Sequence, residues 1–168
     1  FDAPAGPDIF RQAVTLAAQH DTRISLSLSD PWCAERHREA LVTFCHDHVD
    51  ILFANEEEAA SLYEMSGDAA RDALCANVDE VIITRGADGA FVGCGDDCHD
   101  IAAMPLGTVT DTTGAGDLFA AGYLYGRTNG YSVQQSGVIA SIAAGEIISH
   151  IGARPDQDLA GLVSKAGI

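Results

Sequence analysis

Short apolar strands alternate with helical segments along much of this chain, and this alternation restricts its fold more than any other feature. Residues 50–54 and 80–84 are short, nearly continuous apolar runs rather than alternating apolar and polar positions. Strands with this pattern are buried on both faces, as in parallel sheets that helices cover on both sides. The pattern therefore predicts a three-layer α/β/α fold with a mainly parallel sheet.

The other elements follow from hydrophobic periodicity and turn residues. Helices are expected at residues 8–20, 34–48, 56–65, 68–76, 114–127, 132–150 and 157–166. Strands are expected at residues 23–28, 50–54, 80–84 and 90–93, with short strands and loops over 98–110. No repeat and no Ser-, Pro- or Gly-rich linker divides the chain, so residues 1–168 are expected to form one domain.

The charge of the chain limits its partners and its phosphate chemistry. The formal net charge is -16, and Lys165 is the only lysine among 168 residues. An acidic surface repels nucleic-acid backbones and anionic lipid, so neither nucleic acid nor a membrane is an expected partner. The lack of other lysines excludes a Walker A loop and the lysine of protein kinases. A phosphate ligand would need backbone N–H groups at a helix start, or metal ions.

The run from Asp111 to Asp117, Asp-Thr-Thr-Gly-Ala-Gly-Asp, offers such N–H groups. Gly114 and Gly116 permit a tight turn, and the first N–H groups of the helix that follows can bind an anion. A carboxylate at Asp117 could then accept a proton from an attacking hydroxyl. The alternative is structural, with Gly114 as an N-cap and Asp117 as a stabilising acid in the first turn.

Two further segments follow predicted strands at their carboxyl ends, where open α/β sheets bind ligands. Asn55 and Glu58 have the spacing of a capping box at the start of a helix. The segment Thr84–Gly89, Thr-Arg-Gly-Ala-Asp-Gly, is either a hairpin turn or a nucleotide-contacting loop. Arg85 within it either brings a positive charge to the phosphates or points to solvent.

The run that starts at Asp111, Asp-Thr-Thr-Gly-Ala-Gly-Asp-Leu-Phe-Ala-Ala-Gly, resembles the signature of the PfkB carbohydrate kinase family, which has the ribokinase-like fold. The resemblance implies that Asp117 is the catalytic base. It also implies that the backbone of Gly114, Ala115 and Gly116 forms an anion hole for the phosphoryl group in transit.

The two segments at the strand ends are similar to family motifs in the same chain order. The resemblance implies that Asn55 and Glu58 lie near the triphosphate of ATP and organise Mg²⁺ through water. It implies that Thr84, Gly86 and Gly89 belong to a loop that approaches the phosphates or the ribose.

A further implication concerns a monovalent cation such as K⁺, which Asp111 would help to bind together with the Thr113 carbonyl. Residues 149–155, Ser-His-Ile-Gly-Ala-Arg-Pro, otherwise a helix C-cap and stop, would close the nucleotide site and complete the cation site. Together with residues 30–38 and 51–58, this segment looks similar to bacterial adenosine-kinase-like members of the family.

The resemblance implies ATP-dependent transfer of the γ-phosphoryl group to a primary hydroxyl of a sugar or nucleoside. Family members run to about 300 residues or more, beyond the 100 to 200 typical of one domain. This chain opens on Phe1 rather than Met, so the N-terminal portion, the lid and most acceptor contacts are expected outside it. Dimers are expected to form through that lid. The missing acceptor half leaves an alternative, a non-catalytic nucleotide-binding module.

The five cysteines are scattered, and no signal peptide opens the chain, which favours a reduced, cytoplasmic protein. Cys94, Cys98 and His99 could hold a metal, but a second ligand pair at zinc spacing is missing. We therefore expect a hairpin turn at Gly-Asp-Asp. His46 and His48 are expected in a solvated helix end rather than at a metal.

Overall fold

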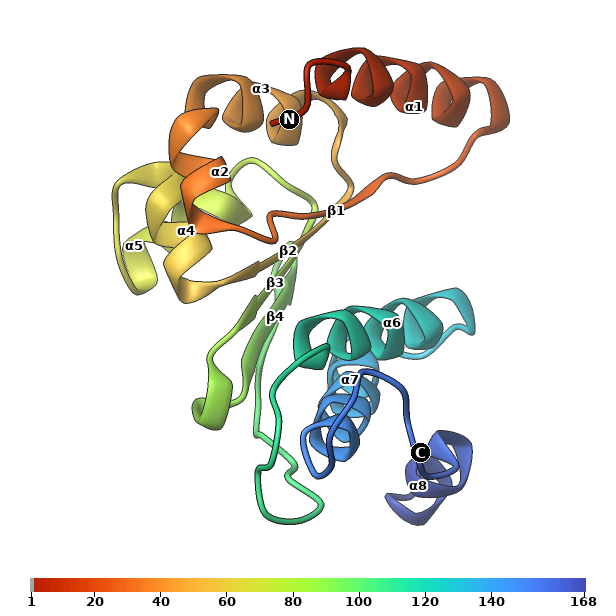
Figure 1. Cartoon of the computed structure of the whole chain (residues 1–168). Helices are drawn as coiled ribbons and strands as arrows, with labels where there is room; N and C mark the ends of the chain where they lie inside the picture. Colours follow the sequence, from red (N-terminus) through yellow and green to blue (C-terminus); the bar gives the residue numbers. More distant parts are fainter. Residues whose placement is uncertain (1) are drawn as a thin grey trace. The chain divides into compact units, whose positions relative to one another are not determined.

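A computed structural model describes residues 2–168, which divide into two compact units, one up to Ile83 and one from Thr84 to Ile168 (Figure 1). The first unit contains α1 (Gly6–His20), β1 (Ser25–Ser27), α2 (Pro31–Arg36), α3 (Arg38–His48), β2 (Ile51–Asn55), α4 (Glu56–Tyr63), α5 (Asp68–Cys75) and nearly all of β3 (Glu80–Thr84). The second contains the 3₁₀ turn η1 (Gly86–Asp88), β4 (Ala90–Cys94), β5 (Asp97–Ile101), α6 (Ala115–Thr128), α7 (Val133–Ile147) and α8 (Leu159–Lys165).

The strands form one five-stranded sheet in the order β1-β2-β3-β4-β5. Strand β1 runs parallel to β2, with Ser25 opposite Ile51. Strands β4 and β5 form an antiparallel hairpin in which Cys94 is opposite Asp97. The predicted α/β fold with a mostly parallel sheet is confirmed. The predicted hairpin turn was one residue too long, because Asp97 already pairs as the first residue of β5.

The helix predicted over residues 34–48 is wrong, since the structure has two helices that meet at His37. Pro31 begins α2, and the Asp30 carboxylate caps it by accepting the Trp32 N–H at 2.8 Å. His37 leaves helical geometry, with φ of -112° and ψ of 21°, and its ring contacts Asp2 at 2.8 Å. Arg38 then begins α3. The contact that accompanies the break links residues far apart in sequence, so local periodicity could not reveal it.

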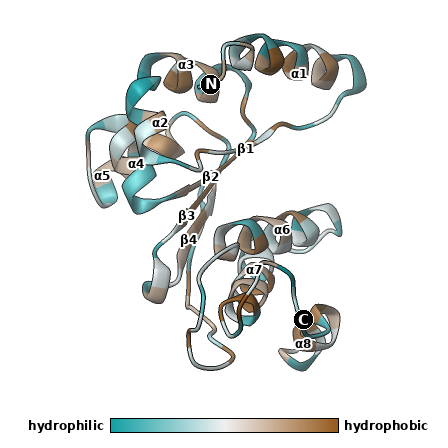
Figure 2. Cartoon of the chain, in the orientation of Figure 1, coloured by the Kyte–Doolittle hydropathy of each residue, from teal (hydrophilic) through white to brown (hydrophobic). Residues whose placement is uncertain are grey.

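The core of the first unit is built from the strands that the sequence marked as apolar. Strands β2 and β3 each bury their first four residues. Leu52 and Ile82 on these strands, with Leu62 of α4 and Leu74 of α5, are 0% exposed. Figure 2 shows the same apolar character along the strands. Each such side chain contributes about 1.5–3 kcal/mol on burial.

Glycines allow α6 and α7 to pack closely in the second unit. A Cβ on Gly122 would lie 2.9 Å from the Cα of Ala140, and one on Gly126 would lie 2.8 Å from the Cα of Ser136. Helix α7 is apolar along most of its length (Figure 2) and packs against β4 and β5. Within residues 2–168, no helix is both long and apolar enough to cross a bilayer.

Candidate active site

Residues 111–117, called the phosphate loop after the role predicted for them, turn into α6 at Gly114. Gly114 has φ of 81° and ψ of 0°, a left-handed conformation that glycine adopts without steric cost. A Cβ at this position would also lie 3.0 Å from the Cβ of Ala153. Helix α6 begins at Ala115, one residue later than predicted. Both the conformation and the neighbouring loop therefore require glycine at residue 114.

The start of α6 leaves several N–H groups free to bind an anion. The Ala115 N–H donates to the Thr112 carbonyl at 3.1 Å, so this one group already has an acceptor. Within residues 2–168, the N–H groups of Gly114, Gly116 and Asp117 have no backbone acceptor. These three groups lie at the turn and in the first turn of the helix, where unpaired N–H groups point along the helix axis, out of its N-terminal end.

Asp117 lies in the first turn of α6 with an exposed side chain. Its carboxylate forms no hydrogen bond or ion pair with any residue in the described part of the chain. A carboxylate in this state can accept a proton from a hydroxyl group that is placed beside it. The geometry thus leaves Asp117 available for the role predicted from the sequence.

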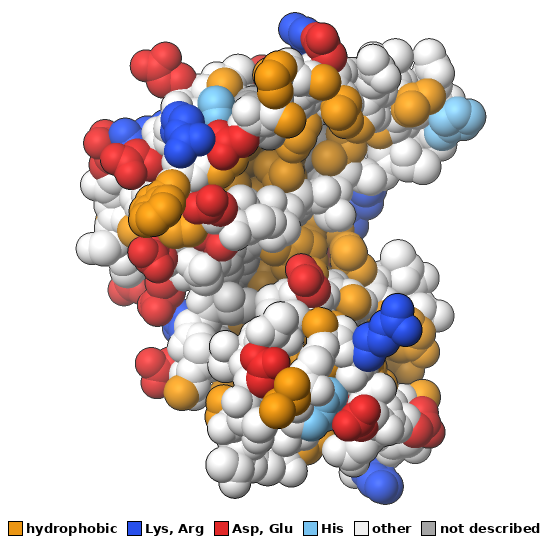
Figure 3. Space-filling model, viewed as in Figure 1, with side chains coloured by type: hydrophobic (Ala, Val, Ile, Leu, Met, Phe, Trp, Pro, Cys, Tyr) orange, Lys and Arg blue, Asp and Glu red, His pale blue; other side chains and the backbone are white. Residues whose placement is uncertain are grey.

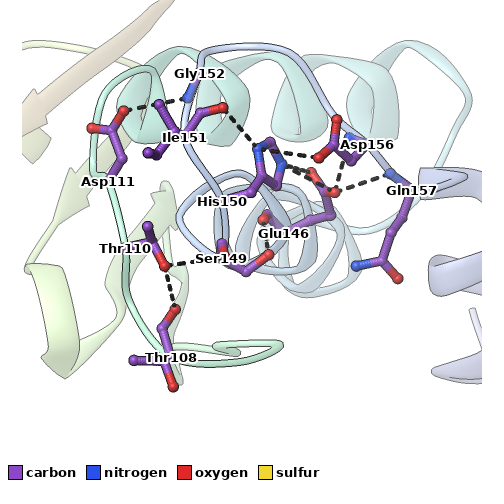
Figure 4. Close-up of polar contacts among 10 residues, drawn as sticks. All are labelled: Thr108, Thr110, Asp111, Glu146, Ser149, His150, Ile151, Gly152, Asp156 and Gln157. Carbon is purple, nitrogen blue, oxygen red and sulfur yellow. Dashed lines mark hydrogen bonds and ion pairs between the residues drawn. The ribbon is translucent and has the colours of Figure 1, made fainter.

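Asp111 fastens the phosphate loop to the loop that follows α7 (Figure 4). One carboxylate oxygen accepts the Thr113 N–H at 2.9 Å, and the other accepts the Gly152 N–H at 3.3 Å. The bond from Thr113 and the bond from Gly152 hold the pKa of Asp111 below its usual range, with a smaller contribution from the charge of His150. Asp111 therefore connects two segments that are 41 residues apart in the sequence.

The second of these segments, the 148–157 loop, also bonds to the phosphate loop through its backbone. The N–H groups of Thr110 and Asp111 donate to the Ile148 carbonyl at 2.8 and 3.4 Å. The Thr110 hydroxyl donates to the Ser149 carbonyl at 3.2 Å. The structure thus brings together two of the segments that the sequence singled out, residues 111–117 and 149–155.

Glu146, a carboxylate that is 0% exposed near the end of α7, was not predicted from the sequence. Its Oε1 accepts the N–H groups of Asp156 and Gln157, both at 3.0 Å, and its two oxygens lie 3.3 and 3.4 Å from His150 Nε2 (Figure 4). The signal was the single acid in an Ala- and Ile-rich helix, four residues before a histidine. Such spacing places both side chains on one helix face.

His150 is the side chain that faces this carboxylate. Burial alone lowers the pKa of His150, but the hydrogen bonds with Glu146 and the Ile151 carbonyl and the charges of Asp156 and Glu146 together raise it above the ordinary 6.5.

The segment Thr84–Gly89 forms a tight turn that is fixed by two glycines. Gly86 and Gly89 have φ of 57° and 85°, and the Arg85 N–H donates to the Gly89 carbonyl at 2.8 Å. A Cβ on Gly89 would lie 1.9 Å from the Ile101 carbonyl oxygen, so no larger residue fits. The Arg85 guanidinium binds Asp100 of β5 at 2.8 Å, which gives it a partner within the hairpin.

In the first unit, Asn55 and Glu58 form the predicted capping box at the start of α4. The Glu58 N–H donates to the Asn55 side chain at 2.8 Å, and the Asn55 N–H donates to Glu58 Oε2 at 2.9 Å. Burial raises the pKa of Glu58, the bond from the Asn55 N–H lowers it, and the charges of Asp30 and Glu57 raise it further. A nearby cation would stabilise the charged form of this carboxylate.

Metal-ligating side chains gather at one other place in the described residues, where ligand atoms of Asp2, Cys33 and His37 lie within 4.8 Å of one another. Arg36 and His37 both bind the same Asp2 oxygen at 2.8 Å. The guanidinium already neutralises this carboxylate, so the cluster is explained as an ion-pair network. Figure 3 shows acidic side chains spread widely over the face in view, in keeping with the net charge of -16.

Comparison with known proteins assigns the chain to a family. Residues 1–159 match the pfkB family carbohydrate kinase profile. An uncharacterized sugar kinase from Archaeoglobus fulgidus is 33% identical over 106 residues, which are 62% of this chain and 42% of that protein.

Two solved structures resemble nearly the whole chain. The probable sugar kinase from Rhizobium etli CFN 42 aligns with 99% of it, with a TM-score of 0.94 and 36% identity. The adenosine kinase from Sinorhizobium meliloti aligns with 98% of it, with a TM-score of 0.92 and 36% identity. The chain spans 51% of each of these two proteins. From the family match over residues 1–159, the chain belongs to the pfkB family of carbohydrate kinases.

Proposed function

We propose that the protein containing this chain transfers the γ-phosphoryl group of ATP to a primary hydroxyl of a sugar or nucleoside. The observation that carries the proposal is the phosphate loop. Gly114 caps α6 in a left-handed conformation, the N–H groups of Gly114, Gly116 and Asp117 have no backbone acceptor, and the Asp117 carboxylate is exposed in the same turn. An anion site and a proton acceptor on one turn are what phosphoryl transfer to an alcohol requires.

In the proposed reaction, Asp117 accepts the proton of the attacking hydroxyl. The N–H groups of Gly114 and Gly116 bind the oxygens of the phosphoryl group as it moves, with Ala115 holding the turn through its bond to Thr112. Thr84, Gly86 and Gly89 supply a tight turn for the nucleotide phosphates or ribose. None of these segments contains a lysine, since Lys165 is the only one in the chain. Backbone N–H groups and a divalent ion would therefore neutralise the phosphates.

Mg²⁺ is the proposed divalent ion, with Asn55 and Glu58 holding it through water. A carboxylate whose pKa is raised by burial and by two neighbouring acids fits a site that carries positive charge when ATP is bound. When bound, Mg²⁺ would neutralise charge on the phosphates. A K⁺ site at Asp111 and the Thr113 carbonyl is a separate proposal, supported by the exposed position of Thr113 beside the Asp111 carboxylate.

The acceptor is proposed to be a sugar or nucleoside, with an adenosine-like molecule as the first to test. Support comes from the 36% identity to the adenosine kinase of Sinorhizobium meliloti over nearly the whole chain. Acceptor contacts and dimer formation are proposed to reside in the half of the relatives that this chain does not span. A cytoplasmic location is proposed from the five cysteines, all of which are free thiols.

The test is Asp117→Asn in the full polypeptide that carries this sequence, assayed with ATP, Mg²⁺ and a panel of sugars and nucleosides. Loss of a general base should lower kcat by about 10²–10⁴-fold while ADP still binds. The matched control is Asp96→Asn, which removes the same charge from an exposed hairpin turn. Retained turnover in Asp117→Asn would refute the role of this residue. ADP binding by the wild type without transfer to any acceptor would instead favour a non-catalytic nucleotide-binding module.

A further inference from the structure

The 148–157 loop is held from the side opposite the phosphate loop by the buried carboxylate of Glu146 and the partly buried ring of His150. Glu146 is 0% exposed, and a buried carboxylate is costly unless its charge and its lone pairs are satisfied. Two backbone N–H groups of the loop, from Asp156 and Gln157, bond to Oε1 at 3.0 Å. Glu146 thus fixes the far end of the loop to the last turn of α7.

His150 completes this arrangement from within the loop (Figure 4). Its Nε2 lies 3.3 and 3.4 Å from the two Glu146 oxygens. Its Nδ1 lies 3.4 Å from the Ile151 carbonyl oxygen and 3.6 Å from Asp156 Oδ2. Both ring nitrogens therefore face oxygen atoms that can only accept. Since a neutral imidazole has a single N–H, the charged ring is the form that satisfies both sides.

The near end of the same loop rests on the phosphate loop. The Gly152 N–H donates to Asp111, and Ala153 lies against Gly114 so closely that a Cβ on the glycine would be 3.0 Å from the alanine Cβ. Only two residues, Ile151 and Gly152, thus separate His150 from Ala153, whose Cβ lies against Gly114. A displacement of His150 would shift Ala153 and, through it, Gly114.

We propose that Glu146 and His150 act together as positioning residues for phosphoryl transfer. Their ion pair holds the 148–157 loop against the phosphate loop, and this contact fixes the orientation of the free N–H groups of the phosphate loop. The proposal rests on the proposed kinase function. In this proposal the two residues orient the N–H groups and do not themselves contact the phosphoryl group. Misplacement of a reacting group by about 1 Å can cost on the order of 10²-fold in rate.

The experiment measures kcat and KM for Glu146→Gln, His150→Gln and the double variant in the full polypeptide. Each single change leaves the other member of the pair without its counter-charge, so kcat should fall about 10–100-fold while KM for ATP and for the acceptor changes less than about 3-fold. The double variant replaces the ion pair with two neutral amides. Its kcat should be no lower than that of the poorer single variant, since the effects of changing two residues in contact are not additive.

Glu80→Gln is the matched control, because Glu80 is a carboxylate that is 1% exposed and bound to Arg23 in the first unit. This change should lower the thermal midpoint without changing kcat below that midpoint. Equal loss of kcat in Glu80→Gln and Glu146→Gln would overturn the proposal, as would a loss confined to KM.

A second readout separates this proposal from the proposed function. Amide hydrogen exchange over residues 111–117 should accelerate in Glu146→Gln and not in Glu80→Gln, whether or not the wild type transfers phosphoryl groups. An inactive wild type with this pattern would refute the kinase assignment while retaining the positioning of the loop. Unchanged exchange in Glu146→Gln would refute the positioning itself.

Discussion

Gly114 and Ala153 approach so closely that no side chain fits between them, since a Cβ on Gly114 would lie 3.0 Å from the alanine Cβ. Replacing Gly114 with Ala therefore adds this close contact to the strain of a left-handed backbone, which costs about 1–2 kcal/mol. We expect Gly114→Ala to lower the free energy of unfolding by more than that amount and to lower kcat sharply. Urea denaturation and initial-rate assays would measure both effects.

Gly130→Ala provides the control for this change. Gly130 has φ of 82°, nearly the same as the 81° of Gly114, but a Cβ there would meet no atom within 4 Å. The difference between the two variants isolates the contact with Ala153. Equal losses of stability and normal turnover in both would show that the contact has no consequence.

Gly126→Ala tests the close packing of α6 on α7. Alanine should favour an isolated helix by about 1 kcal/mol, but the added methyl would lie 2.8 Å from the Cα of Ser136. Overpacking costs about 1–3 kcal/mol, so we expect net destabilisation in denaturant titrations. A rise in stability of about 1 kcal/mol would mean that the two helices separate freely.

Glu58→Gln should separate stability from function. The pKa of Glu58 is raised in the folded protein, so protonation of Glu58 favours the folded state. This contribution to the free energy of unfolding is lost as the pH rises from the pKa of Glu58 in the unfolded chain through its pKa in the folded protein. The amide can still accept the Asn55 N–H. We therefore expect unchanged or higher stability at pH 7, with weaker Mg²⁺-dependent ATP binding, measured by denaturation and calorimetry.

The exposed neighbour Glu57 serves as the control for that prediction. Glu57→Gln removes one of the two charges that raise the pKa of Glu58. It should shift the pH dependence of stability without abolishing metal-dependent binding. If Glu57→Gln weakened ATP binding as strongly as Glu58→Gln, the effect would be one of general charge rather than of Glu58.

His150 should give the protein a pH-dependent stability. Its pKa is raised in the folded state, so the stabilisation is fully present below the ordinary value of 6.5 and is lost as pH rises through the folded value. We expect the thermal midpoints of wild type and His150→Gln to differ most near pH 6 and to converge at higher pH. A constant difference across this range would show that the ring does not change charge in the folded protein.

Local signals predicted much of this structure. The apolar run of β3 and the capping box of Asn55 and Glu58 depend on residues within a few positions of one another, and both formed as expected. The start of α6 at Gly114 was predicted to within one residue for the same reason.

Contacts between distant segments were not predictable in this way. Nothing near Asp111 indicates that its carboxylate binds the Gly152 N–H, and nothing near His37 indicates its contact with Asp2, 35 residues away. Glu146 was missed because its burial depends on how the 148–157 loop folds back over α7. Contacts between segments far apart in the sequence can be identified only from the folded structure.

The close contacts that Gly122 and Gly126 of α6 make with α7 have an electrostatic consequence. Gly122 faces Ala140 and Gly126 faces Ser136, so the two helices run in opposite directions. The positive end of the α6 dipole, which would attract phosphate, thus lies at the same level as the negative end of α7. The two fields therefore partly cancel at this end of the helix pair. The Glu146–His150 pair at the end of α7 joins a carboxylate to its counter-charge and so adds little net charge there. An anion bound at the start of α6 would thus depend on short-range bonds from the N–H groups of Gly114, Gly116 and Asp117 more than on the helix dipole.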